Sequence, residues 1–248
     1  MSGNIIIQLR GVAYSHPDSR GIKETSTLKG IDLEIAEGEI LSVIGPSGAG
    51  KSTFLRLLNR MSDPDKGTIL YRGKPLNSYP VMDLRREILL VNQEPFIAGG
   101  TIADNLRLAR PREKLTSKEM TDVLESVNLQ DKELGLDSSR LSVGEKHRLA
   151  LARAFLLKPA VLLLDEPAAS LDLPRARTVI ETVGALHEKY NITIVMVTHR
   201  FRLARRLGGV VALMVDGGIV EKAQGEEFFA HPQTDVAKQF LEGQEEDT

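Results

Sequence analysis

Alternating and continuous apolar runs divide the chain into two kinds of predicted strand. Near the N-terminus, Ile31, Leu33 and Ile35 alternate with acidic residues. A period of two places these three side chains on one face, which is typical of a strand whose other face meets water. We therefore expect a small, largely antiparallel sheet within the first forty residues.

The apolar runs that follow are uninterrupted. They are ILSVI at 40–44, ILLV at 88–91, VLLL at 161–164 and ITIVMV at 192–197. Strands of a parallel sheet that is covered on both faces have this composition. Helical patterns lie between the runs, for example over 53–59 and 175–190, and this alternation predicts an α/β core built from βαβ units.

The stretch from 95 to 157 has a different pattern. Thr116 and Glu119 form a capping-box sequence, after which apolar residues recur at helical spacing. Ser142 and Glu145 form a second capping box, just ahead of the run LALARAFLL. Since no strand-like run interrupts this stretch, we interpret it as a helical insertion in the α/β core.

Composition excludes several classes of protein. The 248 residues include no cysteine and carry a formal net charge of −2. Disulfides and thiolate metal sites are therefore excluded, and no general attraction to nucleic acid is expected. No apolar run approaches the length of about 18 residues that a membrane span needs, and the N-terminus lacks the basic region of a signal peptide. A role at a membrane would require a membrane-spanning partner.

The first continuous run ends in GPSGAGKST, which matches G-x-x-x-x-G-K-[ST] between a strand and a helix. In such a loop, glycines let backbone N–H groups face phosphate oxygens, a lysine neutralises the β- and γ-phosphates, and a hydroxyl binds Mg²⁺. The alternative, a glycine-rich turn with an exposed lysine, fits the strand–helix context less well. The predicted nucleotide-binding residues are Gly45, Pro46, Ser47, Gly48, Ala49, Gly50, Lys51, Ser52 and Thr53, with Ser52 also a Mg²⁺ ligand.

The other three runs end in polar residues that a nucleotide site needs. Asp165 and Glu166 follow the third run, and we expect the first to hold Mg²⁺ and the second to activate an attacking water. His199 follows the fourth run and would contact the γ-phosphate or that water. Gln93 follows the second run, and its amide oxygen would complete the Mg²⁺ shell or sense the γ-phosphate. Each of these has an ordinary alternative as a solvated strand end or surface side chain, but ligands of open α/β sheets bind at this edge.

The helix start at Ser142 raises a separate question. Gly144 lies in its first turn, where glycine costs about 1 kcal/mol relative to alanine. A bare backbone amide at a helix N-terminus suits an anion that approaches closely. The chain would then contain two phosphate cradles in distant segments, unless this one is merely a capped helix.

Together these motifs resemble those of nucleotide-binding subunits of ABC (ATP-binding cassette) transporters, and the resemblance covers nearly the whole chain. The motifs are GPSGAGKST (Walker A), Gln93 in VNQEP (Q-loop), LSVGEKHR (signature), VLLLDEP (Walker B), SLD at 170–172 (D-loop) and His199 (H-loop). Their order and spacing fit the family.

The resemblance implies that two copies pair head-to-tail. Each ATP then lies between the P-loop of one copy and Ser142, Gly144 and Glu145 of the other, so the two cradles serve different ATP molecules. The signature departs from the usual LSGGQ at Val143 and Glu145, and the bulk of Val143 puts the tightness of the closed dimer in question. Tyr14 lies where the family carries an aromatic residue that stacks on adenine; the alternative is an ordinary strand tyrosine.

The implied architecture is a single ATPase domain of the α/β class with a P-loop NTPase core. Residues 1–94 and 158–230 would form a RecA-like core, a mostly parallel sheet with flanking helices that includes an N-terminal antiparallel β subdomain. Residues 95–157 would form a helical subdomain, and 231–248 a C-terminal tail.

The implied activity is ATP hydrolysis that powers the movement of a solute across a membrane, with ATP and Mg²⁺ as cofactors. The implied partners are a second copy of the chain, transmembrane permease subunits and, for an importer, a solute-binding protein; nucleic acid is not expected. This would place the protein in the cytoplasm, peripheral on the inner face of the cell membrane. Phe96 and Ile97 either line a groove for a permease helix or belong to the local core.

Direction and substrate depend on weaker features. The segment FFAHPQTDVAKQFLEGQ resembles the end of bacterial importer ATPases for phosphate, related oxyanions or polar amino acids, which favours import. GTIADNLRLARP, in contrast, also resembles export-type ATPases for metal ions, lipids or drugs.

Three different classes of protein fit the sequence less well. They are a soluble ABC ATPase of DNA repair or translation, a P-loop kinase of a small molecule, and a pure binding module. The chain shows neither the long coiled coil of the repair ATPases nor the second cassette of the translation ATPases. A small-molecule kinase would not need the signature or His199, and a binding module would not need a full catalytic set.

Overall fold

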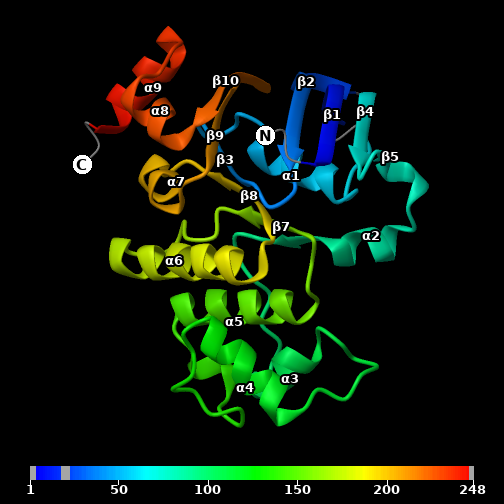
Figure 1. Ribbon diagram of the computed structural model, residues 1–248, viewed down its shortest axis with the longest axis vertical. Coiled ribbons are helices and arrows are strands. Elements are labelled where there is room, and N and C mark those ends of the chain that lie inside the picture. The colour runs from blue at the N-terminus through cyan, green and yellow to red at the C-terminus, as the bar shows by residue number, and fades with distance from the viewer. Residues whose placement is uncertain (1–3, 18–22, 246–248) are drawn as a thin grey trace.

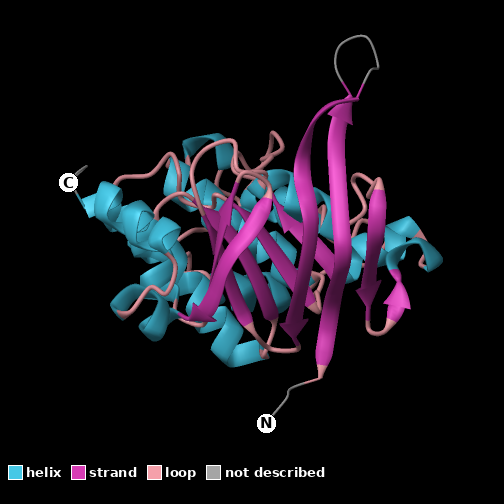
Figure 2. Ribbon diagram, turned by 90° about the horizontal axis from the view of Figure 1, so that it is seen from above, coloured by secondary structure: helices cyan, strands magenta, loops and turns pink. Residues whose placement is uncertain are grey.

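The computed structural model describes residues 4–17 and 23–245, which form two β-sheets flanked by helices (Figures 1 and 2). The smaller sheet is antiparallel and comes from the N-terminal part of the chain. Its strands lie in the order β2 (Lys23–Ala36), β1 (Ile5–Pro17), β4 (Lys66–Tyr71) and β5 (Lys74–Pro75). Ile31, Leu33 and Ile35 of β2 are buried, and the acidic residues between them are exposed. The predicted antiparallel sheet is therefore confirmed.

The larger sheet contains all four continuous apolar runs. Its strands lie in the order β10 (Gly218–Gln224), β9 (Val210–Val215), β3 (Ile40–Ile44), β8 (Thr193–Thr198), β7 (Val161–Asp165) and β6 (Ile88–Val91). The pairs from β9 to β6 are parallel, whereas β10 pairs antiparallel with β9. β8 is shifted by one residue from its predicted bounds, and β7 extends one residue further, to Asp165.

Helices flank this sheet, and some of them lie beyond it at one end of the molecule. In chain order they are α1 (Lys51–Leu58), η1 (Leu76–Ser78), α2 (Val81–Glu87), α3 (Ile102–Arg107), α4 (Ser117–Ser126), η2 (Ser138–Arg140), α5 (Val143–Leu156), α6 (Leu173–Tyr190), α7 (Phe201–Leu207), α8 (Gly225–Ala230) and α9 (Asp235–Glu245). Figure 1 shows α3, α4 and α5 together at one end of the molecule, with α6 alongside α5. Within the described residues, no helix has the length and apolar character needed to cross a membrane.

Alternate side chains of the larger sheet pack into two separate cores. Leu41 and Val43 of β3 belong to one core, together with α1 and the smaller sheet. Leu162 and Leu164 of β7 belong to the other, together with α5 and α6. The sheet is therefore covered on both faces, which explains why its strands lack the polar alternation of β2. The predicted α/β class with an antiparallel part and a helical insertion is the observed one.

Capping accounts for where the helices begin. Both predicted capping boxes are present, at Thr116 for α4 and Ser142 for α5. Helix α1 begins two residues earlier than predicted, directly after Gly50, whose φ of 101° ends the loop in a left-handed conformation. Helix α6 also begins two residues earlier, because the Asp172 side chain accepts a hydrogen bond from the Arg175 N–H.

Candidate active site

The carboxyl ends of β3, β8, β7 and β6 bring the predicted motifs to one edge of the larger sheet. A cavity of about 450 Å³ opens there. Its lining residues are His16, Thr27, Ser47, Gly48, Gly50, Lys51, Ser52, Thr53, Gln93, Glu166 and His199. The structure thus gathers the P-loop, the Q-loop glutamine, the Walker B glutamate and the H-loop histidine around a single space, although they lie far apart in the sequence.

The P-loop depends on glycine at two positions. Gly45 has a φ of 153°, and a Cβ there would lie 2.0 Å from the Met214 carbonyl oxygen. Gly50 has a φ of 101°, and a Cβ there would lie 2.8 Å from the Thr27 carbonyl oxygen. Since side chains do not fit at either position, the glycines let this backbone pass close to β9 and β2 and turn into α1.

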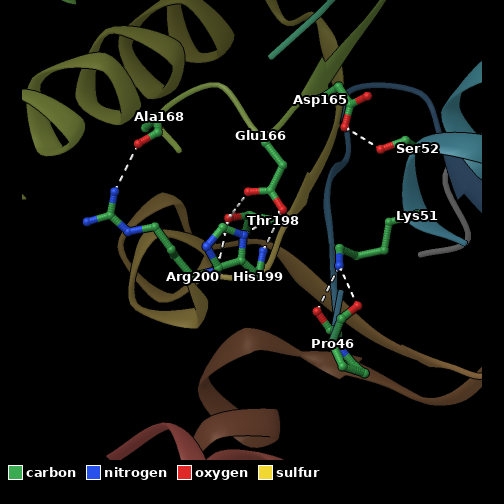
Figure 3. Close-up of polar contacts among 10 residues, drawn as sticks. Pro46, Lys51, Ser52, Asp165, Glu166, Ala168, Thr198, His199 and Arg200 are labelled. Carbon is green, nitrogen blue, oxygen red and sulfur yellow. Dashed lines mark hydrogen bonds and ion pairs between the residues drawn. The ribbon is translucent and has the colours of Figure 1, made fainter. Parts of the chain in front are cut away.

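Lys51 is anchored to its own loop. Its Nζ donates hydrogen bonds to the carbonyl oxygens of Gly45 at 2.8 Å and Pro46 at 2.9 Å (Figure 3). Only 8% of the residue is exposed, and this burial lowers the pKa of the ammonium, while the carboxylates of Glu166 and Asp165 act in the opposite direction. A cation is therefore held at the cavity wall, facing two nearby acidic groups.

Ser52 and Asp165 bring a hydroxyl and a carboxylate oxygen together. The Ser52 hydroxyl donates to Asp165 Oδ1 at 2.8 Å (Figure 3). Burial raises the pKa of the Asp165 carboxyl, and the hydrogen bond from Ser52 opposes that shift. Together with the amide of Gln93 in the same cavity, this gives a hydroxyl, a carboxylate and an amide oxygen, a donor set that fits Mg²⁺.

Glu166 has an unusual backbone and a firmly held side chain. Its φ is +47°, a left-handed conformation that costs roughly 1–2 kcal/mol outside glycine. The carboxylate accepts hydrogen bonds from the Thr198 hydroxyl at 3.1 Å and the His199 N–H at 3.0 Å, and the His199 ring Nδ1 lies 2.8 Å away (Figure 3). The hydrogen bonds and the His199 ring hold the carboxylate at the edge of the cavity.

Two cavity residues were not predicted from the sequence, namely His16 and Thr27. His16 is exposed, and its Nε2 lies 3.1 Å from the Thr53 hydroxyl. Tyr14 is half-buried against the core of the smaller sheet and does not line the cavity, although its ring meets that of His16 edge to face at 5.0 Å. Tyr14 was predicted from the family resemblance alone, and no pattern in the sequence marked His16 as a cavity residue.

The signature residues lie away from this cavity. Ser142, Gly144 and Glu145 form the first turn of α5, and none of them lines it. Glu145 Oε1 pairs with Lys132 at 2.8 Å, and that contact, ahead of the cap bonds with Ser142, lowers the pKa of the Glu145 carboxyl to about 2. The Gln-to-Glu departure therefore retains the cap and adds an ion pair within the chain.

A second hollow, of about 350 Å³, lies beside the residues that follow Gln93. Its walls include Pro95, Phe96, Leu108 and Arg153. Phe96 is 71% exposed, whereas Ile97 packs against the α5–α6 core. The structure thus separates the two residues that the sequence left undecided, with Phe96 at the groove and Ile97 at the core.

Known proteins match the chain in sequence and in structure. The family model for the ABC transporter matches residues 28–169. The L-cystine import ATP-binding protein TcyN of Bacillus subtilis is 40% identical over 86% of this chain and 86% of that protein. The structure of cbiO1 from Clostridium perfringens, part of the ABC transporter complex cbiONQ, has a TM-score of 0.82 at 28% identity and covers 92% of both chains.

Exporters match over a smaller part of their length. The structure of a bacterial Atm1-family ABC exporter with ATP bound has a TM-score of 0.82 at 25% identity, over 98% of this chain and 43% of that chain. The family model covers more than half of the chain. The chain therefore belongs to the ABC transporter family, as an ATP-binding and ATP-hydrolysing component that powers solute transport through transmembrane partners.

Proposed function

We propose that two copies of the chain bind two ATP molecules head-to-tail, each between the cavity of one copy and the start of α5 in the other. The observation that carries this proposal is Gly144. A Cβ at this position would meet nothing closer than the Arg175 Cβ at 3.8 Å, which is an ordinary contact. Packing within the chain therefore does not require glycine at this buried position. The exposed part of the helix N-terminus is formed by Ser142 and Val143, and an anion arriving from outside would bind there.

Each polar residue of the cavity would have a distinct role in binding or hydrolysing ATP. Ser52, Asp165 and Gln93 would hold Mg²⁺, which supplies charge neutralisation at the phosphates when bound. Lys51 would contact the β- and γ-phosphates. Glu166 would accept a proton from the attacking water. His199 would orient the Glu166 carboxylate through its ring nitrogen and would contact the γ-phosphate.

Adenine would lie against the outer part of the cavity, beside the aromatic residues of β1. We expect His16→Ala to raise the Kd for ATP about tenfold, because stacking on a base is worth roughly 1–3 kcal/mol. Tyr14→Leu, which keeps an apolar side chain against the core, should change this Kd less than threefold. Equilibrium titration of a fluorescent ATP analogue measures both. The reverse order of effects would assign adenine stacking to Tyr14, as the family resemblance predicts.

The membrane partners would dock a helix in the groove beside Phe96, and transport would be import of a small polar solute. Similarity to TcyN over 86% of both chains supports a polar amino acid, and the C-terminal segment resembling importer ATPases supports an amino acid or a small anion. Export remains the alternative, on the strength of the segment GTIADNLRLARP.

Reconstitution tests the direction of transport. The chain is placed with its co-purified membrane subunits in liposomes so that the ATPase faces the outer medium, and the lumen is loaded with labelled L-cystine or phosphate and, where one co-purifies, the binding protein. Import corresponds to movement toward the ATPase side, so external ATP should release lumenal label, and a Glu166→Gln complex should not. ATP-dependent accumulation of externally added label would instead establish export.

A further inference from the structure

His147 connects two motifs that the head-to-tail arrangement assigns to different ATP molecules. The residue lies near the end of the signature segment, one turn after Val143 in α5, and only 3% of it is exposed. Its Nδ1 lies 2.9 Å from the Val143 carbonyl oxygen in the first turn of α5. Its Nε2 lies 3.0 Å from the carbonyl oxygen of Gln93. One buried ring therefore joins the signature turn to the Q-loop backbone.

The protonation of the ring decides which of these two contacts is a hydrogen bond donated by His147. Both partners of His147 are carbonyl oxygens, which only accept hydrogen bonds, and a neutral imidazole has a single N–H. The imidazolium is the form that donates to both, and the tautomer protonated on Nε2 donates to Gln93. Removing the donor would leave the part-buried Gln93 carbonyl without this partner.

A second residue of α5 fastens the other end of the same segment. Arg153 Nη2 donates to the Phe96 carbonyl oxygen at 2.7 Å, and its side chain also lines the groove beside Phe96. Two donors from one helix thus hold Gln93 and Phe96. The side chain of Gln93 faces the cavity of its own chain, while Val143, at the start of the same helix, is 48% exposed.

We propose that His147 is a positioning residue that makes the Q-loop and the signature helix move together, with Arg153 as the second attachment. This inference rests on the proposed head-to-tail dimer. A γ-phosphate sensed by Gln93 in one site then shifts the start of α5, which completes the other site. The two ATP sites, and the groove beside Phe96, are coupled through α5 rather than through the interface alone.

Three histidine variants of the full-length chain test this link. His147→Leu keeps a side chain of similar size and has no donor, His147→Gln restores a donor, and His187→Ala is the matched control. His187 is also a helical histidine with a ring nitrogen on a carbonyl oxygen, that of Ile192 at 2.9 Å, but it lies on α6 outside the site. The readouts are the Kd for ADP, the kcat and Hill coefficient for ATP, and the melting temperature.

We expect His147→Leu to lower kcat about tenfold, the order of effect that the loss of one hydrogen bond to a backbone acceptor has, and to bring the Hill coefficient toward 1. The Kd for ADP of His147→Leu should change less than twofold. His147→Gln should recover most of the lost kcat, and His187→Ala should have the kcat and Hill coefficient of the wild type. Arg153→Met removes the second attachment between α5 and the segment after Gln93, and it tests the link if His147→Leu does not fold. It should lower kcat and the Hill coefficient in the same way.

Specific outcomes would overturn the link. One is a wild-type kcat and Hill coefficient in His147→Leu, or in Arg153→Met if His147→Leu does not fold. The other is a loss of kcat in His147→Leu that parallels a loss of melting temperature and is not recovered by His147→Gln. Failure of the underlying dimer would show differently, as a wild-type chain that stays monomeric with ATP.

Discussion

Replacing Glu166 with glutamine is expected to lower the turnover of ATP by about 10²–10⁴-fold, the usual contribution of a general base. The amide has nearly the shape of the carboxylate, and its single oxygen can still accept the hydrogen bond from the His199 N–H, whereas its NH2 group takes the place of the oxygen that accepts from the Thr198 hydroxyl. It has no useful affinity for a proton from water. The Kd for ATP should change little, because the phosphate-binding loop is left intact. Release of phosphate over time, measured with saturating ATP and Mg²⁺, checks the prediction.

The same variant should accumulate the ATP-bound dimer, because hydrolysis no longer removes the phosphate that joins the copies. The chain contains no cysteine, so a disulfide can report the geometry directly. In the Glu166→Gln background, Ser47→Cys with Ser142→Cys should give a dimer band under oxidising conditions only when ATP is present. Both positions are exposed within one chain. Ser78→Cys, on the exposed η1, replaces Ser47→Cys in the control and should not cross-link with Ser142→Cys.

Two outcomes would contradict this prediction. An undiminished rate in Glu166→Gln would assign the general base to another group. A variant that binds ATP but remains monomeric, with no cross-link between positions 47 and 142, would contradict the shared site, whatever the rate.

Much of this fold could be predicted because its signals are local. The four apolar runs form adjacent strands, since a strand buried on both faces needs apolar side chains at every position, as Leu162 to Leu164 show. The capping boxes at Thr116 and Ser142 depend on residues three apart. The site could be predicted in outline for a related reason, because the ends of parallel strands meet at one edge regardless of the loops between them.

Features set by contacts between distant segments were not predictable. His16 reaches Thr53, and His147 reaches Gln93, across 37 and 54 residues of chain. A histidine in a helix has no sequence signature for such a partner, because the distance depends on how the Q-loop crosses α5. The distinction between Phe96 and Ile97 has the same origin. Side chains in an irregular segment follow no fixed period, so the sequence pattern does not show which of the two residues faces the core and which faces the groove.

Lys51→Met should have the second large effect. Nucleotide would lose the ammonium, and a hydrogen bond to a charged group is worth about 1.5–3 kcal/mol, so the Kd for ATP is expected to rise roughly 10–150-fold. Methionine retains most of the apolar stem. The carbonyl oxygens of Gly45 and Pro46 lose their donor as well, and Asp165 and Glu166 lose the cation that partly offsets their charges. The change therefore affects both the ligand contact and the loop that makes it.

Thermal unfolding with and without ATP separates these two effects. A ligand at about 100 times its Kd stabilises the folded state by about 2.7 kcal/mol, and this gain nearly disappears if the Kd rises a hundredfold. Lys51→Met should therefore lose most of the ATP-dependent rise in melting temperature, whereas Lys74→Ala, on the exposed β5, should keep it. A lower melting temperature without ATP but an unchanged ATP-dependent rise would mean that Lys51 serves the loop and not the phosphates. The ammonium has three N–H donors and uses two of them on the carbonyl oxygens of Gly45 and Pro46, so one donor is left for a phosphate oxygen. If both the β- and the γ-phosphate take a donor from Lys51, one backbone carbonyl loses its partner, and the strength of that hydrogen bond becomes part of the free-energy cost of binding ATP.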